Sequence, residues 1–585
     1  MAHPRSGAVA LALGVALGSW MSALQLRALR ERPGWAELQR QEPRTARFVR
    51  SAVVLPLPAA LGAVAVGVLT FGHINGLLRT HPRLVVPLPP FPFDVSKTQL
   101  VIGEVHNQDG TRSDEPSWMV LPERGMSTGI LVTGAPGSAK TSGAQYPFTA
   151  QLIRLHPDNP ISKLGGLVID GKGNYSEFVR EQCRAAGREG DYYEVSLESG
   201  VRYNIIGRPD LSAPALGGHI ADMIANVQGE SYSDPFWRQE AKDLATQCIR
   251  IVRLQDRREP TMADLYRLAT SFDAFKARVQ ELAKEITSGA RAASETERAE
   301  LESLRFWLMS KAALLDPKLR SSIAAGLNGV CSLFDSPKIK AIFCPRPGEE
   351  NFLGFDELIA RGQIVALRVP YSELKTVSQV VGTMTKLNFF DAVLNRLSRA
   401  EASRGDVGRM LFFVADEYDG IVTQPGDGNF LAKCREAKCA SIIATQSYES
   451  LVAKLRNEHL AAQLLANLRT KIFLCAEDNY TAHQAAQLCG EVERMKVTRG
   501  RNESVRTSAF SFLDGKILSA DAGSVGESTS HSFHREYLFP PRCFTTLRLN
   551  QAIVKLFDGE RVLDPTYTYL KPIYANPNTS WFDSF

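Results

Sequence analysis

The sequence predicts an α/β protein with a mostly parallel sheet, an inserted all-α domain and an N-terminal transmembrane helical hairpin. Two sequence patterns predict the sheet and the helical insertion. Short, continuous apolar runs alternate with segments of helical periodicity, as in parallel strands covered on both faces. Between 211 and 350 such runs are scarce, and apolar residues recur at helical spacing. The chain of 585 residues is long enough for two or more domains.

The expected strands and domain limits follow from these runs. We expect strands at 129–133, 166–170, 363–369, 411–415, 440–445 and 471–475. The domain limits are 1–80 for the hairpin, 81–94 for a Pro-rich linker, 95–210 with 351–585 for the sheet domain, and 211–350 for the helical insertion. The Ser- and Gly-rich segment 499–535 is expected to be a mobile loop or a poorly ordered hairpin.

A glycine-rich loop follows the first expected strand and precedes an expected helix at 142–155. In that setting consecutive backbone N–H groups can wrap a phosphate at a helix N-terminus. The expected nucleotide ligands are Gly134, Gly137, Ser138, Ala139, Lys140 and Thr141. The Thr141 hydroxyl would also bind Mg²⁺. The alternative is an ordinary turn before a lysine. Pro147 should bend the following helix or limit its first segment.

Ala139 stands where such loops usually have glycine. Glycine there lets the backbone approach the phosphates and adopt dihedral angles that disfavour other residues. A Cβ costs about 1–3 kcal/mol if strain is forced. The substitution therefore predicts weaker nucleotide affinity unless a slightly reshaped loop absorbs it.

Polar side chains follow the expected strands 411–415 and 440–445. The carboxyl ends of parallel strands meet at one edge of the sheet, where nucleotides bind. We expect Asp416 to hold Mg²⁺ through water, and Glu417 to orient and polarise the attacking water. The alternative for this pair is a solvated loop start. Gln446 ends the second of these strands, where its amide can contact a terminal phosphate and report its loss.

Two more charged residues accompany this set. Asp170 ends the strand 166–170 at the same edge, and we expect it to support the nucleotide site. Arg435 precedes the strand 440–445. Its spacing alone favours a solvated basic helix face, and the alternative is an arginine finger directed at a neighbouring subunit's phosphate.

Composition excludes some classes of protein. The nine cysteines are scattered and contain no CxxC pair. This argues against a disulfide framework or a zinc site, and it indicates a reducing compartment. The net charge of +5 permits a nucleic-acid partner without requiring one.

The N-terminal region has two stretches of membrane-spanning length, about 6–26 and 51–72. A cleaved signal peptide is the alternative for the first and a buried core helix for the second. The loop 27–50 holds seven Arg and three Glu, and the positive-inside rule would place it in the cytoplasm. An ATP site needs the opposite topology. We therefore expect both termini in the cytoplasm and this loop outside.

In this order, the motifs resemble those of the type IV coupling proteins. These are the TraD/TraG-like membrane motors of conjugation and type IV secretion, grouped with FtsK and HerA among RecA-like motors. The matching segments are GAPGSAKT, LVIDGKGNY at 167–175, RYNII at 202–206, DPFWRQEAKDL at 234–244, FVADEYDGI at 413–421, REAKCASIIATQSYESL at 435–451 and LLANLRTKIFLCAEDNYTA at 464–482. The resemblance covers about residues 120–490 and the membrane hairpin.

The resemblance implies a RecA-like P-loop NTPase fold that uses ATP and Mg²⁺. It implies a homo-hexamer in the bacterial inner membrane, multi-pass, with a cytoplasmic ATPase domain. The implied partners are single-stranded DNA with its relaxase or relaxosome, or effector proteins, together with components of the type IV secretion channel. By position it assigns Asp416 and Glu417 as the Walker B pair and Gln446 as the sensing glutamine, and it makes Arg435 a trans arginine finger.

Two alternatives stay open. The first is a receptor and docking platform for secreted proteins, with weak or vestigial ATPase activity. The second, an FtsK-like chromosome translocase, fits the segment 234–244 less well.

Overall fold

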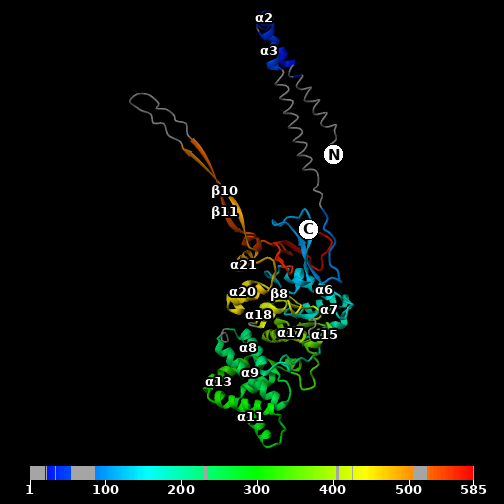
Figure 1. Ribbon diagram of the computed structural model, residues 1–585, viewed down its shortest axis with the longest axis vertical. Helices are drawn as coiled ribbons and strands as arrows, with labels where there is room; N and C mark the ends of the chain where they lie inside the picture. The colour runs from blue at the N-terminus through cyan, green and yellow to red at the C-terminus, as the bar shows by residue number, and fades with distance from the viewer. Residues whose placement is uncertain are drawn as a thin grey trace, which may run out of the picture. The chain divides into compact units, whose positions relative to one another are not determined.

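The computed structural model describes residues 20, 23–32, 34–54, 86–229, 234–403, 407–423, 426–504 and 524–583. The chain divides into two units, Met1–Pro87 and Leu88–Phe585. Figure 1 traces the elements of each unit.

In the first unit, residues 23–30 are helical, and helices α2 (Trp35–Gln41) and α3 (Pro43–Val54) follow. The segment 27–50, expected as a loop, is therefore mostly helical. The predicted spans 6–26 and 51–72 fall largely outside the described residues. Within the part of the chain that the structure does describe, no helix combines the length and the apolar character needed to cross a membrane.

The second unit is built on an 11-stranded sheet with the order β2-β1-β13-β12-β9-β3-β8-β7-β4-β6-β5. The six expected strands form β3 (Ile130–Thr133), β4 (Gly165–Asp170), β6 (Ile364–Arg368), β7 (Leu411–Ala415), β8 (Cys439–Thr445) and β9 (Thr470–Phe473). From β9 to β5 every pairing is parallel. The predicted α/β class with a mostly parallel sheet is therefore confirmed.

Five strands of this sheet were not expected. They are β1 (Gln99–Val105), β2 (Ser117–Pro122), β5 (Tyr192–Val195), β12 (Gln551–Lys555) and β13 (Thr566–Leu570). Apart from β5, they form an antiparallel extension beside β9. Several of them mix polar residues into short runs, so no continuous apolar signal marks them.

Helices cover both faces of the sheet, and the side chains of each parallel strand alternate between two cores. Phe413 of β7 packs into one core, with helix α17 (Thr376–Ser403), while Phe412 packs into the other with α6 (Tyr146–Arg154). This two-sided burial explains why the parallel strands are continuously apolar. The other helices of this part are α5 (Glu123–Met126), α7 (Tyr175–Ala185), α16 (Tyr371–Leu374), α18 (Gly426–Lys433), α19 (Tyr448–Leu455), α20 (Glu458–Asn467), α21 (Asn479–Cys489) and α22 (Pro541–Thr545).

Between β5 and β6 the described residues form helices and no strand. The helices are α8 (Ala213–Gln228), α9 (Pro235–Asp256), α10 (Met262–Thr270), α11 (Phe272–Thr287), α12 (Glu295–Trp307), α13 (Pro317–Cys331), α14 (Pro337–Phe343) and α15 (Phe355–Arg361). Side chains cap several of them: Thr261 and Ser294 form capping boxes, and Asp234 accepts from the Phe236 N–H at 2.8 Å. Figure 1 shows α8, α9, α11 and α13 gathered at one end of the unit, beyond α17.

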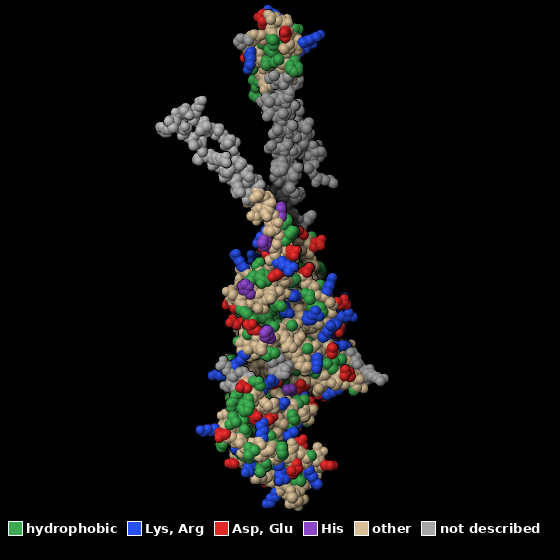
Figure 2. All heavy atoms as spheres, turned by 60° about the vertical axis from the view of Figure 1, so that its left-hand side comes forward, with side chains coloured by type: hydrophobic (Ala, Val, Ile, Leu, Met, Phe, Trp, Pro, Cys, Tyr) green, Lys and Arg blue, Asp and Glu red, His purple; other side chains and the backbone are tan. Residues whose placement is uncertain are grey.

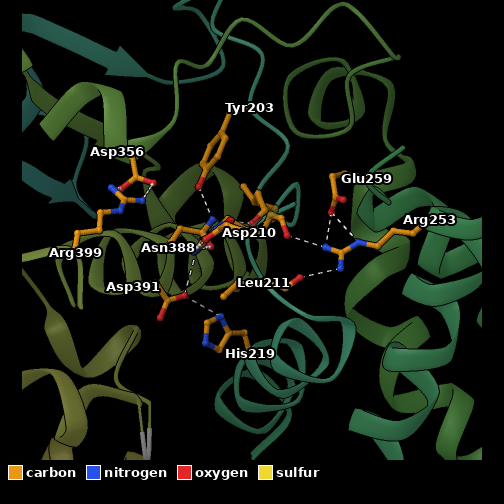
Figure 3. Close-up of polar contacts among 12 residues, drawn as sticks. Tyr203, Asp210, Leu211, His219, Arg253, Glu259, Asp356, Asn388, Asp391 and Arg399 are labelled. Carbon is orange, nitrogen blue, oxygen red and sulfur yellow. Dashed lines mark hydrogen bonds and ion pairs between the residues drawn. The ribbon is translucent and has the colours of Figure 1, made fainter. Parts of the chain in front are cut away.

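A polar network joins this helical segment to α17 (Figure 3). The Arg208 guanidinium donates to Asn388 Oδ1 at 2.9 Å and to Asp391 Oδ2 at 3.2 Å, both on α17. Asn388 in turn donates to the Tyr203 hydroxyl at 2.6 Å, and His219 of α8 lies 3.6 Å from Asp391. The helical segment is thus anchored to a helix of the sheet domain by charged hydrogen bonds as well as by apolar packing.

The segment expected as a mobile loop or poorly ordered hairpin includes much of a long two-stranded hairpin. Its strands, β10 (Glu491–Ser504) and β11 (Ser524–Tyr537), pair antiparallel from Glu491 with Tyr537 to Ser504 with Ser524. Residues 505–523 lie outside the described part of the chain.

Candidate nucleotide site

The glycine-rich loop leaves β3, which lies between β8 and β9 in the sheet. The first helical turn after it, Lys140–Gln145, is a π-helix, and α6 then begins with Pro147 in its first two positions. Proline is tolerated there because it has no N–H to donate. The expected effect of Pro147 on the first helical segment is therefore observed.

Lys140 is buried in the loop. Its ammonium donates to the carbonyl oxygens of Gly134 at 2.5 Å and Ala135 at 3.0 Å. Burial lowers the pKa of Lys140, and Asp416 opposes that effect. The side chain therefore lies in the loop, within the electrostatic influence of Asp416.

Ala139 adopts the backbone conformation that glycine usually provides. Its φ of 71° and ψ of 26° lie in the left-handed region. For an L-residue this costs roughly 1–2 kcal/mol. The loop has therefore kept its dihedral angles and carries the strain, instead of being reshaped around the Cβ. At Gly134, by contrast, space is the constraint: a Cβ there would lie 2.6 Å from Ser138 Oγ and 2.7 Å from Leu474 Cβ.

Asp416 and Glu417 follow β7 and meet the loop. Asp416 is buried, and its Oδ2 accepts from the Thr141 hydroxyl at 3.2 Å. Glu417 has a left-handed φ of 52°, and its N–H donates to Asp416 Oδ1 at 3.0 Å. Two oxygen groups thus converge from strand and loop, which is the donor chemistry that Mg²⁺ prefers.

Asp170 organises the loop that follows β4. Its Oδ1 accepts from the N–H groups of Lys172 at 3.0 Å and Gly173 at 2.6 Å, and its Oδ2 accepts from the Ser176 N–H at 2.8 Å. The carboxylate is almost fully buried. Asp170 therefore fixes the backbone that carries Lys172 and does not itself line the cavity described below.

These elements enclose a cavity of about 510 Å³. It is lined by Pro136, Gly137, Ala139, Lys140, Thr141, Ser142, Tyr146, Lys172, Asn174, Glu417, Thr445, Gln446 and Leu549. Of the expected site residues, Gly137, Ala139, Lys140, Thr141, Glu417 and Gln446 line it directly, whereas Gly134, Ser138, Asp170 and Asp416 are buried beside it. A larger crevice of about 820 Å³ lies among α8, α9 and α18, away from these residues.

Arg435 lies apart from this cavity. It is exposed in the turn between α18 and β8, near the amino end of β8, whereas Gln446 follows the carboxyl end of the same strand. Within one chain the two residues are thus at opposite edges of the sheet. The structure therefore does not bring Arg435 to the cavity of its own chain.

The predicted site residues did not include seven of the lining residues, which are Pro136, Ser142, Tyr146, Lys172, Asn174, Thr445 and Leu549. The charged tip Asp170-Gly171-Lys172-Gly173 was a visible signal, but nothing in the sequence told which neighbour Lys172 contacts. Leu549 comes from a part of the chain more than four hundred residues from the loop, and no local pattern could have placed it.

Comparisons with known proteins concern the family and the fold. Residues 410–545 match the family model described as the TraM recognition site of TraD and TraG. The fold is that of the bacterial conjugative coupling protein TrwBdeltaN70, with a TM-score of 0.51 at 15% identity over 82% of this chain and 90% of that one. TrwB in complex with GDPNP gives a TM-score of 0.50 at 13% identity, over 84% of this chain and 100% of that chain.

A further solved structure, TrwB in complex with ADP and Mg²⁺, gives a TM-score of 0.50 at 13% identity, over 84% of this chain and 98% of that one. No curated protein matches the sequence. The family match and the shared fold confirm the resemblance to the type IV coupling protein family.

Proposed function

We propose that this chain is an ATP-driven coupling protein of a conjugation or type IV secretion system. One observation carries the proposal. A single cavity is lined by the glycine-rich loop with Lys140, by Glu417 after β7 and by Gln446 after β8, and Asp416 contacts Thr141 at its wall. This combination provides a phosphate cradle, a metal-ligand pair and a water-activating carboxylate in one place.

In this proposal Lys140 and the loop N–H groups hold the phosphates, and Thr141 and Asp416 hold Mg²⁺. When bound, the ion would neutralise charge on the phosphate oxygens. Glu417 orients and polarises the attacking water, and Gln446 contacts the terminal phosphate. TrwB, which shares the fold, has been solved with ADP and Mg²⁺ and with GDPNP, and this supports the same ligand class here.

Arg435 is proposed to act in trans within a homo-hexamer. Its exposure and its place at the edge opposite its own cavity support this role. Mixing Arg435→Ala chains with Glu417→Gln chains tests it. If Arg435 acts in trans, mixed rings contain interfaces with both residues intact and recover activity that neither variant has alone. Mixtures that recover no ATPase activity would contradict the trans assignment.

The proposed setting is the bacterial inner membrane, with the ATPase domain in the cytoplasm and spans at about 6–26 and 51–72. The proposed cargo is single-stranded DNA with its relaxase, or protein effectors, delivered to the secretion channel. On the face shown in Figure 2, basic and acidic side chains are interspersed over the second unit. The distribution of charge on that face therefore does not favour DNA over protein as the cargo. A topology reporter at residue 40 tests the membrane arrangement, and a cytoplasmic signal there would contradict it.

The central test is ATP hydrolysis by the purified full chain, with and without single-stranded DNA. Wild type should hydrolyse ATP faster when DNA is present, and Lys140→Ala should abolish the activity. Equal inactivity of both proteins with every DNA tested would refute the motor function.

A second candidate is a receptor and docking platform for secreted proteins with weak ATPase activity. Ala139 favours it, because this residue lines the cavity where such loops usually have glycine, and its Cβ can hinder the approach of a phosphate to the backbone. Under this alternative, wild type hydrolyses ATP weakly and Ala139→Gly gives a large gain.

A further inference from the structure

Lys172 lies at the Walker B carboxylates, although it belongs to neither the glycine-rich loop nor β7. Its ammonium is 2.7 Å from Asp416 Oδ2, the oxygen that also accepts from Thr141, and 3.6 Å from Glu417 Oε1. The side chain is 44% exposed and lines the cavity. It is thus a second lysine facing the space that Lys140 faces.

The backbone that carries Lys172 is held from several sides. Asp170 accepts from its N–H, the Tyr371 N–H donates to Gly171 O at 3.0 Å, and Arg368 Nε donates to Gly173 O at 3.2 Å. The aliphatic stem beyond this fixed backbone is flexible. An ammonium on such a stem can exchange partners over a few ångströms without moving the loop.

The position of Lys172 along the cavity indicates which phosphate it can reach. Its neighbours are Glu417, the residue assigned to the attacking water, and Asp416, the residue assigned to the metal. In phosphoryl transfer both of these belong at the terminal phosphate, where negative charge is spread over the equatorial oxygens. Lys140 lies in the loop that wraps the inner phosphates, and a lysine at its position also reaches the terminal phosphate, so Lys172 would add a second cation there.

We propose that Lys172 is a second phosphate-binding lysine that contacts the terminal phosphate and distinguishes a nucleoside triphosphate from a diphosphate. The inference rests on the proposed function, because it assigns a role within that nucleotide site. Asp416 and Glu417 hold the ammonium at the mouth of the cavity. A terminal phosphate offers it a charged hydrogen-bond partner in exchange.

A simpler role for Lys172 is to neutralise Asp416 and nothing more. The two roles predict opposite changes in nucleotide affinity when Lys172 is removed. A lysine that only pairs with Asp416 competes with Mg²⁺ for that carboxylate, so its removal should tighten Mg²⁺-dependent binding of both nucleotides. A lysine that contacts the terminal phosphate contributes to triphosphate affinity, and its removal should weaken that affinity alone.

The experiment compares binding of fluorescent ADP and of a fluorescent non-hydrolysable ATP analogue to the full chain, in Mg²⁺ and in EDTA. The variants are Lys172→Met, Lys172→Gln and Lys172→Arg. The matched control is Lys340→Met, because Lys340 is a comparably exposed lysine paired with Asp335 at 2.9 Å and lies on α14, outside the cavity. Far-UV circular dichroism checks that each variant is folded.

We expect Lys172→Met and Lys172→Gln to weaken binding of the triphosphate analogue about tenfold or more, the size of one charge-assisted hydrogen bond. ADP affinity should change less than about twofold, since ADP has no terminal γ-phosphate for the ammonium to bind. Lys172→Arg should retain most of the discrimination, and Lys340→Met should match wild type.

An unchanged ratio of the two affinities, an equal loss for both nucleotides, or tighter binding in Mg²⁺ would overturn the assignment of Lys172 alone. Wild type that binds neither nucleotide would overturn the proposed function as well. Loss of binding in Lys140→Ala serves as the positive control for the site.

Discussion

Two lysine–aspartate pairs in the sheet domain have the same chemistry and nearly the same length. Lys172, in the loop after β4, lies 2.7 Å from Asp416, which follows β7. Lys386 of α17 lies 2.6 Å from Asp427 of α18. Lys172 is 44% exposed and faces a cavity, whereas the side chains of Lys386 and Asp427 are fully buried.

The buried pair is saturated with local partners. The Lys386 ammonium also donates to Ile421 O at 2.5 Å and to Thr423 Oγ1 at 3.2 Å. Asp427 accepts from the Thr423 N–H at 2.9 Å and from the Tyr418 hydroxyl. Every strong contact of this pair is internal, so it fixes the segment after Glu417 and leaves no group free to bind a ligand.

The cavity pair has partners to exchange. Asp416 and Glu417 outweigh the effect of burial and raise the pKa of Lys172, so this group keeps its charge while half exposed. The difference between the pairs teaches that distance does not identify a functional ion pair. Exposure to a cavity and the number of fixed partners are what separate the two pairs.

The largest loss of stability is expected from a substitution that breaks the buried pair. Lys386→Met should lower the free energy of unfolding by about 3–5 kcal/mol, because it leaves Asp427 buried without its counter-ion. Lys172→Met should cost less than about 1 kcal/mol, since its partner remains accessible to water. Urea denaturation of both variants measures the contrast. Similar losses of unfolding free energy in the two variants would show that burial does not set how much each pair stabilises the protein.

The next largest effect is expected at a buried lysine that has no carboxylate partner among the residues that the structure describes. Lys471 of β9 donates to Leu468 O at 2.6 Å, and burial, together with Lys555 and Arg469, lowers its pKa to about 8. The unfolded chain, with a lysine pKa near 10.5, binds more protons between pH 8 and 10.5. Stability should therefore rise with pH across that window, by up to about 3 kcal/mol.

Lys471→Met should remove this rise and stabilise the protein at pH 7. The measurement is the free energy of unfolding of wild type and variant from pH 7 to 10.5, taken as a difference so that other lysines cancel. A difference that is flat with pH would contradict the prediction.

The third prediction tests the cavity itself. Glu417→Gln should slow ATP hydrolysis at least about a hundredfold, since it removes the group that polarises water. Affinity for a non-hydrolysable ATP analogue should stay close to wild type, and so should thermal stability. Loss of binding and hydrolysis together would mean that Glu417 supports the structure of the site instead.

The smallest effect concerns Ala139→Gly. Glycine relieves roughly 1–2 kcal/mol of left-handed strain but adds about 0.5–1 kcal/mol of unfolded-state entropy. A net stabilisation below about 1 kcal/mol should follow. Because Ala139 already has the glycine-like conformation, ATP hydrolysis should change less than about threefold. A gain of tenfold or more would favour the docking-platform function.

Much of this architecture was visible in the sequence. The parallel strands are recognisable because burial on both faces demands continuous apolar runs, and charged residues mark their carboxyl ends. The glycine-rich loop, Asp416, Glu417 and Gln446 could be placed at one edge by that rule alone. The helical spacing of apolar residues likewise predicted that the chain between 211 and 350 is mostly helical, and the structure describes helices there.

Other features are properties of the folded chain only. The antiparallel strand β1 pairs with β13, more than four hundred residues further along the chain, so no local pattern could place that pairing. The partners of Lys172 and Lys386 are likewise set by which elements meet. The sequence by itself determined six parallel strands, the edge of the sheet at which their polar tips meet, and the unusual Ala139. Only the tertiary structure decided which charges are locked and which remain available, because burial and ion pairing depend on neighbours that sequence spacing does not specify.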